Sequence, residues 1–135
     1  PCVRLFDERY GSAQVRAADI ALRVEGDDGF VLDDVSSMSK ISRDPLDLVR
    51  HAIGREHQYP DGLMLFLGTM FAPTKDRHAP GQGFTHSVGD IVSVSTPTLG
   101  TLVNRVDYCH RIAPWTFGAA ALAASLARRG VLPVR

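Results

Sequence analysis

The sequence predicts one α+β domain with a mainly antiparallel sheet, and three observations favour this class. Apolar and polar residues alternate around 20–24 and again around 92–94, at the two-residue period of a strand with one buried face. Each segment is followed by a turn containing Gly and by a second apolar run, which is typical of a β-hairpin. Helical spacing of apolar residues begins near Pro45. The 135 residues, 44% of them hydrophobic, suffice for one core and not for two.

Composition excludes several classes of protein. Fifteen basic and fifteen acidic side chains give a formal net charge of zero, which does not favour a nucleic-acid surface or an anionic membrane. The longest apolar run, near 119–127, is interrupted by Ser125 and is far shorter than the roughly 20 residues of a membrane span. The first residues have no features of a secretory leader. We therefore expect a soluble protein that is not secreted.

Two cysteines, Cys2 and Cys109, could pair, but one bridge in a domain of this hydrophobicity is not a disulfide framework. Reduced thiols are expected, and with them a cytoplasmic location. The chain begins at Pro1 rather than Met, and its first predicted strand, 2–6, starts almost at once. These features favour a truncated or processed piece of a longer polypeptide.

A first hairpin is predicted between residues 20 and 32. Ile20, Leu22 and Val24 form the apolar face of one strand, and 30–32 return as its partner. The turn between them, 25–29, contains two Gly and three acidic residues. The regular oxygen-ligand spacing of a calcium loop is missing, so these carboxylates are interpreted as a solvated turn.

A polar loop at 36–40 precedes the first predicted helix. Asp44 is expected to cap this helix and Pro45 to occupy its first position. The apolar positions Leu46, Val49, Ala52 and Ile53 fall on one face, which we expect to pack on the sheet. Gly54 weakens the second half of the helix, and the turn at 59–62 ends it.

The segment 63–68 is the strongest strand prediction and the expected centre of the fold. Five apolar residues follow the Asp61–Gly62 turn and are stopped by Gly68, which predicts a buried strand that delivers Thr69 to a loop. About fifteen residues rich in Pro, Gly, His and charge come next. A polar loop on a rigid strand is a common form of binding rim, although an ordinary surface connection has the same pattern.

The last third predicts a second hairpin and a second helix. Strands near 91–95 and 100–106 are joined by a short turn that contains Pro97. Thr116 is the expected N-cap of an Ala-rich helix over 117–127, with Arg128 and Arg129 at its negative end and Gly130 as its stop. This helix buries little area and is expected to cover an edge or an interface.

The residues alone indicate no specific chemistry. The five histidines lack the spacing of a zinc site, and neighbouring Cys109 and His110 point to opposite sides of an extended chain. A Glu-x-Glu pair, a phosphate-binding Gly loop and the elbow of an esterase are all missing from the sequence. These observations therefore predict an α+β domain with a candidate site around Thr69 and do not indicate its chemistry.

A series of motifs resembles the closing half of the fumarylacetoacetate hydrolase family. In that family an apolar strand ends in Gly-Thr, and a Gly-Asp-x-Val strand and a Leu-Gly-x-Leu-x-Asn-x-Val strand follow. The matching segments here are 68–69, 89–92 and 99–106, with a Ser-Ser-Met loop and helix at 36–57 and a first strand at 2–6. Further matches at 71–74, 83–86 and 114–118 look like the bacterial branch associated with 2-keto-3-deoxy sugar acids.

The resemblance implies a fold and an activity. The fold would be a β-roll of antiparallel and mixed sheets with two packed helices. The activity would be that of a cytoplasmic enzyme, usually homodimeric, which hydrolyses C–C bonds of acylpyruvates or dehydrates or decarboxylates 2-keto-3-deoxy acids. A divalent cation, commonly Mg²⁺, chelates the 2-oxo acid in this family. Its carboxylate ligands, and a nearby Lys, belong to the part of the family's chain that precedes the segment matched here, so no metal ligand is assigned in this sequence.

The site residues that the resemblance carries over are few. Thr69 would present its hydroxyl and amide to the substrate carboxylate, and Gly68 would allow close approach. Ser37 and Met38 would lie near the entrance of the site. No catalytic residue is assigned. The competing hypothesis is a non-catalytic, β-rich module that self-associates through its apolar strands and Ala-rich helix.

Overall fold

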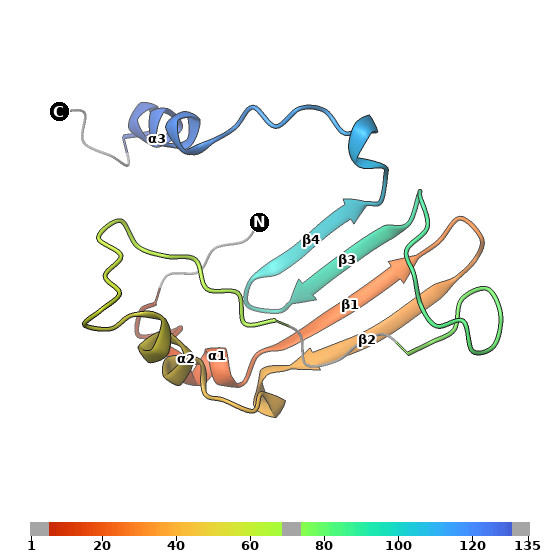
Figure 1. The fold of residues 1–135 in the computed structure, drawn as a ribbon, viewed down its shortest axis with the longest axis horizontal. Helices are drawn as coiled ribbons and strands as arrows, with labels where there is room; N and C mark the ends of the chain where they lie inside the picture. The colour runs from red at the N-terminus through yellow and green to blue at the C-terminus, as the bar shows by residue number, and fades with distance from the viewer. Residues whose placement is uncertain (1–5, 69–73, 131–135) are drawn as a thin grey trace.

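The computed structural model describes residues 6–68 and 74–130, and within them it shows an open sheet of four antiparallel strands with three helices (Figure 1). The sheet order is β2-β1-β3-β4. The predicted α+β class with an antiparallel sheet is confirmed. The strands are β1 (Asp19–Glu25), β2 (Val31–Ser37), β3 (Ile91–Thr96) and β4 (Gly100–Arg105), and the helices are α1 (Ser12–Arg16), α2 (Pro45–Ala52) and α3 (Ala119–Arg128).

Both predicted hairpins are present, and the register explains their burial. Val24 of β1 pairs with Leu32 of β2 and with Val92 of β3, so three apolar side chains share one face of the sheet. Val24 is fully buried and Leu32 is 4% exposed. The alternation that predicted these strands therefore marks the buried face, and the two buried side chains of the strands lie at this end of the sheet.

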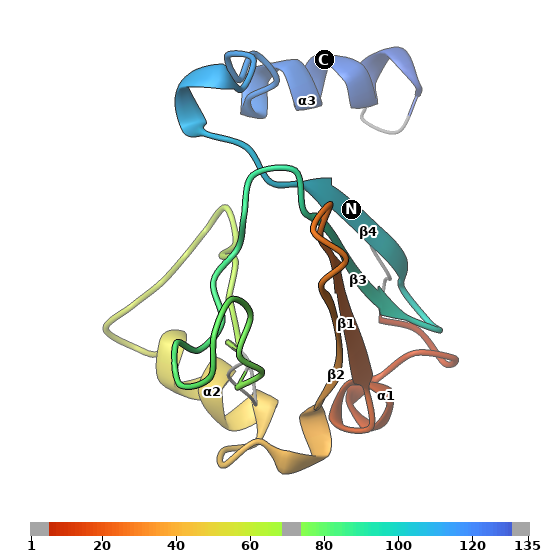
Figure 2. The same cartoon turned by 90° about the vertical axis from the view of Figure 1, so that its right-hand side faces the viewer.

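The helix predicted after Asp44 is confirmed, although its packing differs from the prediction. The Asp44 carboxylate accepts a hydrogen bond from the Leu46 amide at 2.9 Å, as an N-cap does. The helix ends at Ala52, because Ile53 already has an extended backbone. Its neighbour is α1, a short helix that the sequence did not indicate, and the prediction that α2 packs on the sheet is wrong (Figure 2).

The segment 63–67 is not the buried strand that its apolar run predicts. The structure assigns it no strand, and Met64 and Phe66 are 79% and 87% exposed. An apolar run becomes a strand only when another strand accepts its backbone hydrogen bonds, and among the described residues none pairs with this segment. The predicted strand at 2–6 lies outside the described residues except for Phe6, which is in no strand.

Helix α3 stands apart from the sheet in both views (Figures 1 and 2). It begins after Gly118 rather than at the predicted cap Thr116, and none of its side chains is buried. Gly130 follows it with φ +68°, the left-handed conformation expected of a helix stop. Within the described residues, no helix has the length and apolar content that crossing a membrane requires.

Val24 should be the most sensitive position of the sheet. Replacing it with Ala leaves a cavity in the core, and we expect the free energy of unfolding to fall by about 1–3 kcal/mol. Val35→Ala is the matched control, because Val35 lies on the neighbouring strand but is 52% exposed. Urea unfolding followed by circular dichroism measures both variants, and equal losses would contradict the location of the core.

Candidate functional site

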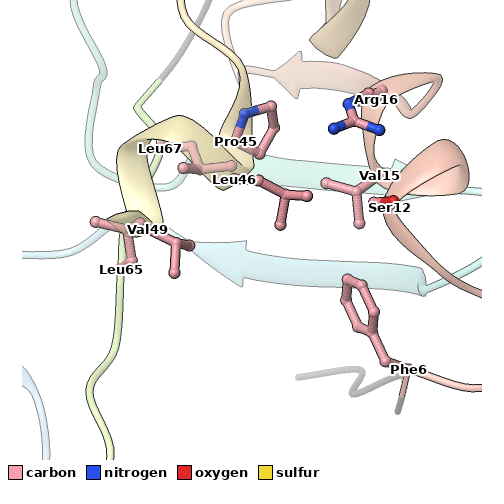
Figure 3. A pocket seen from close by; sticks show the side chains of 9 residues that line it. All are labelled: Phe6, Ser12, Val15, Arg16, Pro45, Leu46, Val49, Leu65 and Leu67. Carbon is pink, nitrogen blue, oxygen red and sulfur yellow. The ribbon is translucent and has the colours of Figure 1, made fainter. Parts of the chain in front are cut away.

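An apolar pocket lies between α1, α2 and the segment 65–67 (Figure 3). It forms because Val15 of α1 and Leu46 and Val49 of α2 face each other, while Leu65 and Leu67 close one side. Its volume is about 190 Å³, and its wall is almost entirely carbon. A space of this kind favours an apolar group and offers few hydrogen bonds to a polar ligand.

One ion pair lies at the wall of this pocket and joins its two helices. Arg16 of α1 hydrogen-bonds through Nε and Nη2 to the Asp44 carboxylate, the Nη2 contact being 3.1 Å long. These hydrogen bonds, together with that from the Leu46 amide, lower the pKa of Asp44 to about 2 despite its partial desolvation. Asp44 therefore both caps α2 and fixes it to α1.

The residues predicted to bind substrate are placed as follows. Gly68 follows Leu67 of the pocket wall, is exposed and has φ +78°, a conformation that disfavours any residue with a Cβ. A Cβ built at Gly68 would have no neighbour within 4 Å, so nothing described crowds it. Thr69 lies outside the described residues, and its role stays a prediction.

Ser37 and Met38 lie at the junction of β2 with a short 3₁₀ helix, Met38–Lys40. Met38 is 8% exposed, and its amide donates to the Ala18 carbonyl at 2.9 Å. The Ser37 and Ser39 hydroxyls are 2.8 Å apart. Neither Ser37 nor Met38 lines the apolar pocket, and no described contact joins them to Gly68, so their place at a site entrance also stays a prediction.

The structure contains a buried charged cluster that the sequence did not reveal, made of Arg77, Asp28 and Asp90. The Arg77 guanidinium is 2% exposed and forms bidentate hydrogen bonds with both carboxylates. Asp28 comes from the β1–β2 turn, and Asp90 precedes β3. The distances are 3.0 Å to both Asp28 oxygens and 2.6 and 2.8 Å to those of Asp90. We call these three residues the Arg77 cluster.

Two glycines lie in the turns that carry these carboxylates. A Cβ at Gly26 would lie 2.3 Å from Arg77 Nη2 and from an Asp28 oxygen and 3.2 Å from an Asp90 oxygen, so the side chains of the Arg77 cluster would have to shift. A Cβ at Gly89 would lie 2.7 Å from an Asp27 oxygen, and Gly89 has φ +98°. Gly26 therefore leaves room for the cluster, and the left-handed backbone favours Gly at position 89.

The pKa shifts follow from these contacts. Hydrogen bonding from Arg77 is the main cause that lowers the pKa of Asp90 to about 2, and the Ser87 amide adds to it at 2.9 Å. Arg77 likewise lowers the pKa of Asp28, and the two carboxylates raise the pKa of Arg77. All three groups are thus charged at neutral pH.

The described residues do not fit a divalent cation. Within residues 6–68 and 74–130, no group of three or more His, Cys, Asp or Glu side chains has an arrangement that could hold a metal ion. Asp28 and Asp90 lie on either side of Arg77, and their carboxylate oxygens accept hydrogen bonds from its guanidinium. The metal that the family resemblance implies would therefore need ligands other than these.

A signal for the Arg77 cluster existed in the sequence. Pairing Val24 with Val92 places the end of β1 beside the start of β3, and with them the acidic turns at 27–28 and at Asp90. Two carboxylates at one end of a sheet indicate a cation between them. Arg77, in the polar loop, is that cation. Its position in the sequence does not indicate that it pairs with either Asp.

In comparisons with known proteins, no family model, no curated protein and no solved structure matches the chain. The functional proposals below therefore rest on the motifs in the sequence and on the contacts described above.

The Arg77 cluster should make stability depend on acidity. Because the pKa of Asp90 is lowered on folding, its contribution is complete above the unfolded pKa near 3.8 and is lost as pH falls toward 2. We expect Asp90→Asn to lower the free energy of unfolding by about 1–3 kcal/mol at pH 6 and to flatten its decline between pH 4 and 2. Urea titrations of both proteins across pH 2–6 measure this, and parallel curves would contradict it.

Proposed function

We propose that this chain forms the C-terminal part of a metal-dependent catalytic domain that resembles the fumarylacetoacetate hydrolase family and acts on 2-oxo acids. The observation that carries the proposal is the ordered series of family-like motifs, from the Ser-Ser-Met loop at 36–38 through Gly68–Thr69 to the strand at 99–106. Two of these motifs lie on the β3–β4 hairpin and another ends β2. The activity would be C–C hydrolysis of acylpyruvates, or dehydration or decarboxylation of 2-keto-3-deoxy acids.

In this proposal the chain binds and orients the substrate. Thr69 donates its hydroxyl and amide hydrogen bonds to the substrate carboxylate, and Gly68 keeps the adjoining backbone accessible. Ser37 and Met38 belong to the entrance. A divalent cation, Mg²⁺ by resemblance, would act as a Lewis acid toward the 2-oxo acid, held by carboxylates from polypeptide outside this chain.

The exposed apolar surface supports an assembly larger than the described residues. Met64 and Phe66 are almost fully exposed, and the pocket beside Leu65 and Leu67 is open. Apolar surface of this extent is usually covered in a folded protein. We propose that further polypeptide of the catalytic domain, within a homodimer, covers it and completes a β-roll.

The experiment begins with the protein isolated from its natural source. Intact-mass measurement establishes the whole polypeptide, and turnover of acylpyruvates and of 2-keto-3-deoxy acids is then assayed with added Mg²⁺. Activity toward either class is expected from a species heavier than this sequence or accompanied by a partner chain. A mass equal to this sequence, without a partner and without turnover, refutes the proposal.

Thr69→Val tests the predicted substrate contact in that enzyme. Losing a hydroxyl that hydrogen-bonds a carboxylate should cost about 1–3 kcal/mol of substrate interaction, which is roughly 5–150-fold in kcat/KM. Thr101→Val is the control, because Thr101 is exposed on β4. Equal kinetics for the two variants would remove Thr69 from the site.

A second candidate is a non-catalytic module that self-associates, and the exposure of β4 and α3 favours it. Every residue of β4 is exposed, including Leu102 and Val103, and α3 buries no side chain among the described residues. An open apolar edge strand is a surface for pairing with another chain. The Thr69→Val variant separates the candidates, because a scaffold has no turnover to lose.

A further inference from the structure

We propose that two copies of this chain associate through the open edge of β4, so that their two sheets join into one antiparallel sheet across a two-fold axis at Val103. The proposal specifies the contact that a self-associating module needs, and it applies equally to a homodimeric enzyme. It goes beyond the function proposed above, because it is tested by association and not by turnover.

The backbone of β4 directs hydrogen-bonding groups to the open edge at every second residue. In an antiparallel ladder, successive residues turn their N–H and C=O groups to opposite neighbours. Val106 turns inward, since its amide donates to the Asp90 carbonyl at 2.8 Å and its carbonyl accepts a bond from the same turn. At the alternate positions, Thr101, Val103 and Arg105 therefore turn outward, and no described hydrogen bond reaches these backbone groups.

One register of two β4 strands engages all three outward residues. Two identical strands that pair antiparallel in one sheet lie about a two-fold axis, and opposite residues have their side chains on the same face. With the axis at Val103, the middle of the three, Val103 lies opposite its own copy and Thr101 lies opposite Arg105 of the second copy. The one charged side chain of β4 then faces a hydroxyl, whereas an axis at Arg105 would oppose two like charges.

The other edge of the sheet, β2, is protected by side chains of the same chain. The Val35 amide donates to the Asp34 carboxylate at 2.8 Å, and Lys75 Nζ donates to the Val31 carbonyl. Charged side chains on an edge strand are a common device against pairing with another chain. Since no described side chain occupies an edge group of β4, a further strand can add there.

The segment that follows β4 supplies additional area for the interface. Six residues a side are far fewer than the roughly 20–30 of a stable interface, so strand pairing alone is not enough. Figure 1 shows α3 on the β4 side of the sheet, and α3 buries no side chain among the described residues. The connection to α3 exposes Trp115 by 86% and Phe117 by 54%. Aromatic residues of this kind anchor interfaces, so we assign residues 112–128 to contacts with the second copy.

Val103→Pro tests the pairing, because it removes an outward amide and no hydrogen bond within the described sheet. In sedimentation of the whole polypeptide, the wild type should be a dimer at micromolar concentration. The dissociation constant of the variant should be at least about tenfold larger, since each copy loses one hydrogen bond. Val35→Pro is the matched control, because Val35 lies on the other edge strand and is similarly exposed. Equal dissociation constants for the two variants, or a monomeric wild type, overturn the proposal.

Disulfide formation tests the register, in protein with Cys109 replaced by Ser. Val103→Cys should cross-link two copies, because Cα atoms of a hydrogen-bonded antiparallel pair are about 5.5 Å apart, within disulfide range. Leu102→Cys is the control, since Leu102 would lie opposite Asn104 of the second copy. Its own counterpart would be a diagonal neighbour at about 7–8 Å, which is too far for a disulfide. Equal cross-linking of the two variants overturns the register.

Should Val103→Pro fail to fold, Val103→Lys replaces it, with Val35→Lys as its control. A monomer whose Thr101 and Val103 amides are protected from hydrogen exchange shows that another strand of the same polypeptide covers β4, and this result overturns the proposal. A dimer that depends on Val103 but has no turnover supports the proposal and counts only against the enzymatic function.

Discussion

The buried guanidinium of Arg77 balances two carboxylates that strand pairing brings to one end of the sheet. Removing Arg77 and Asp90 from water costs several kcal/mol for each, and their attraction offsets this only when nearly every donor and acceptor is satisfied. Asp28 is half-exposed and keeps part of its hydration. Here five guanidinium donors meet five oxygen acceptors. Because this balance depends closely on geometry, the β1–β2 turn, the start of β3 and the segment that carries Arg77 are expected to stay ordered or to loosen together.

The apolar contacts of the described residues are modest by comparison. Four hydrophobic side chains of the described residues are buried, namely Tyr10, Val24, Leu32 and Met38, and only Val24 and Leu32 lie within strands. Pairing of β1 with β2 and β3 therefore places the buried pair Val24 and Leu32 at the same end of the sheet as the Arg77 cluster. The opposite end, beside α1, contains the other two buried side chains, Tyr10 and Met38, together with the Arg16–Asp44 pair.

Local patterns predicted the elements whose causes are local. The hairpins follow from two-residue alternation and turn residues, and α2 follows from Asp44 and Pro45, so the structure agrees with each. The strand prediction for 63–67 was wrong because hydrophobicity indicates that a segment tends to be buried but does not identify a strand with which it pairs. Helix α1 was not predicted because its five residues are too few to show a helical period of apolar residues.

The Arg77 cluster could not be predicted from local sequence patterns, because its residues are distant in the sequence. Arg77 lies 49 residues from Asp28 and 13 residues from Asp90 in the sequence, and the register of β1 with β3 is what places the two carboxylates at the same end of the sheet. Asp28 of the acidic turn at 25–29 is therefore paired with a guanidinium rather than left to solvent.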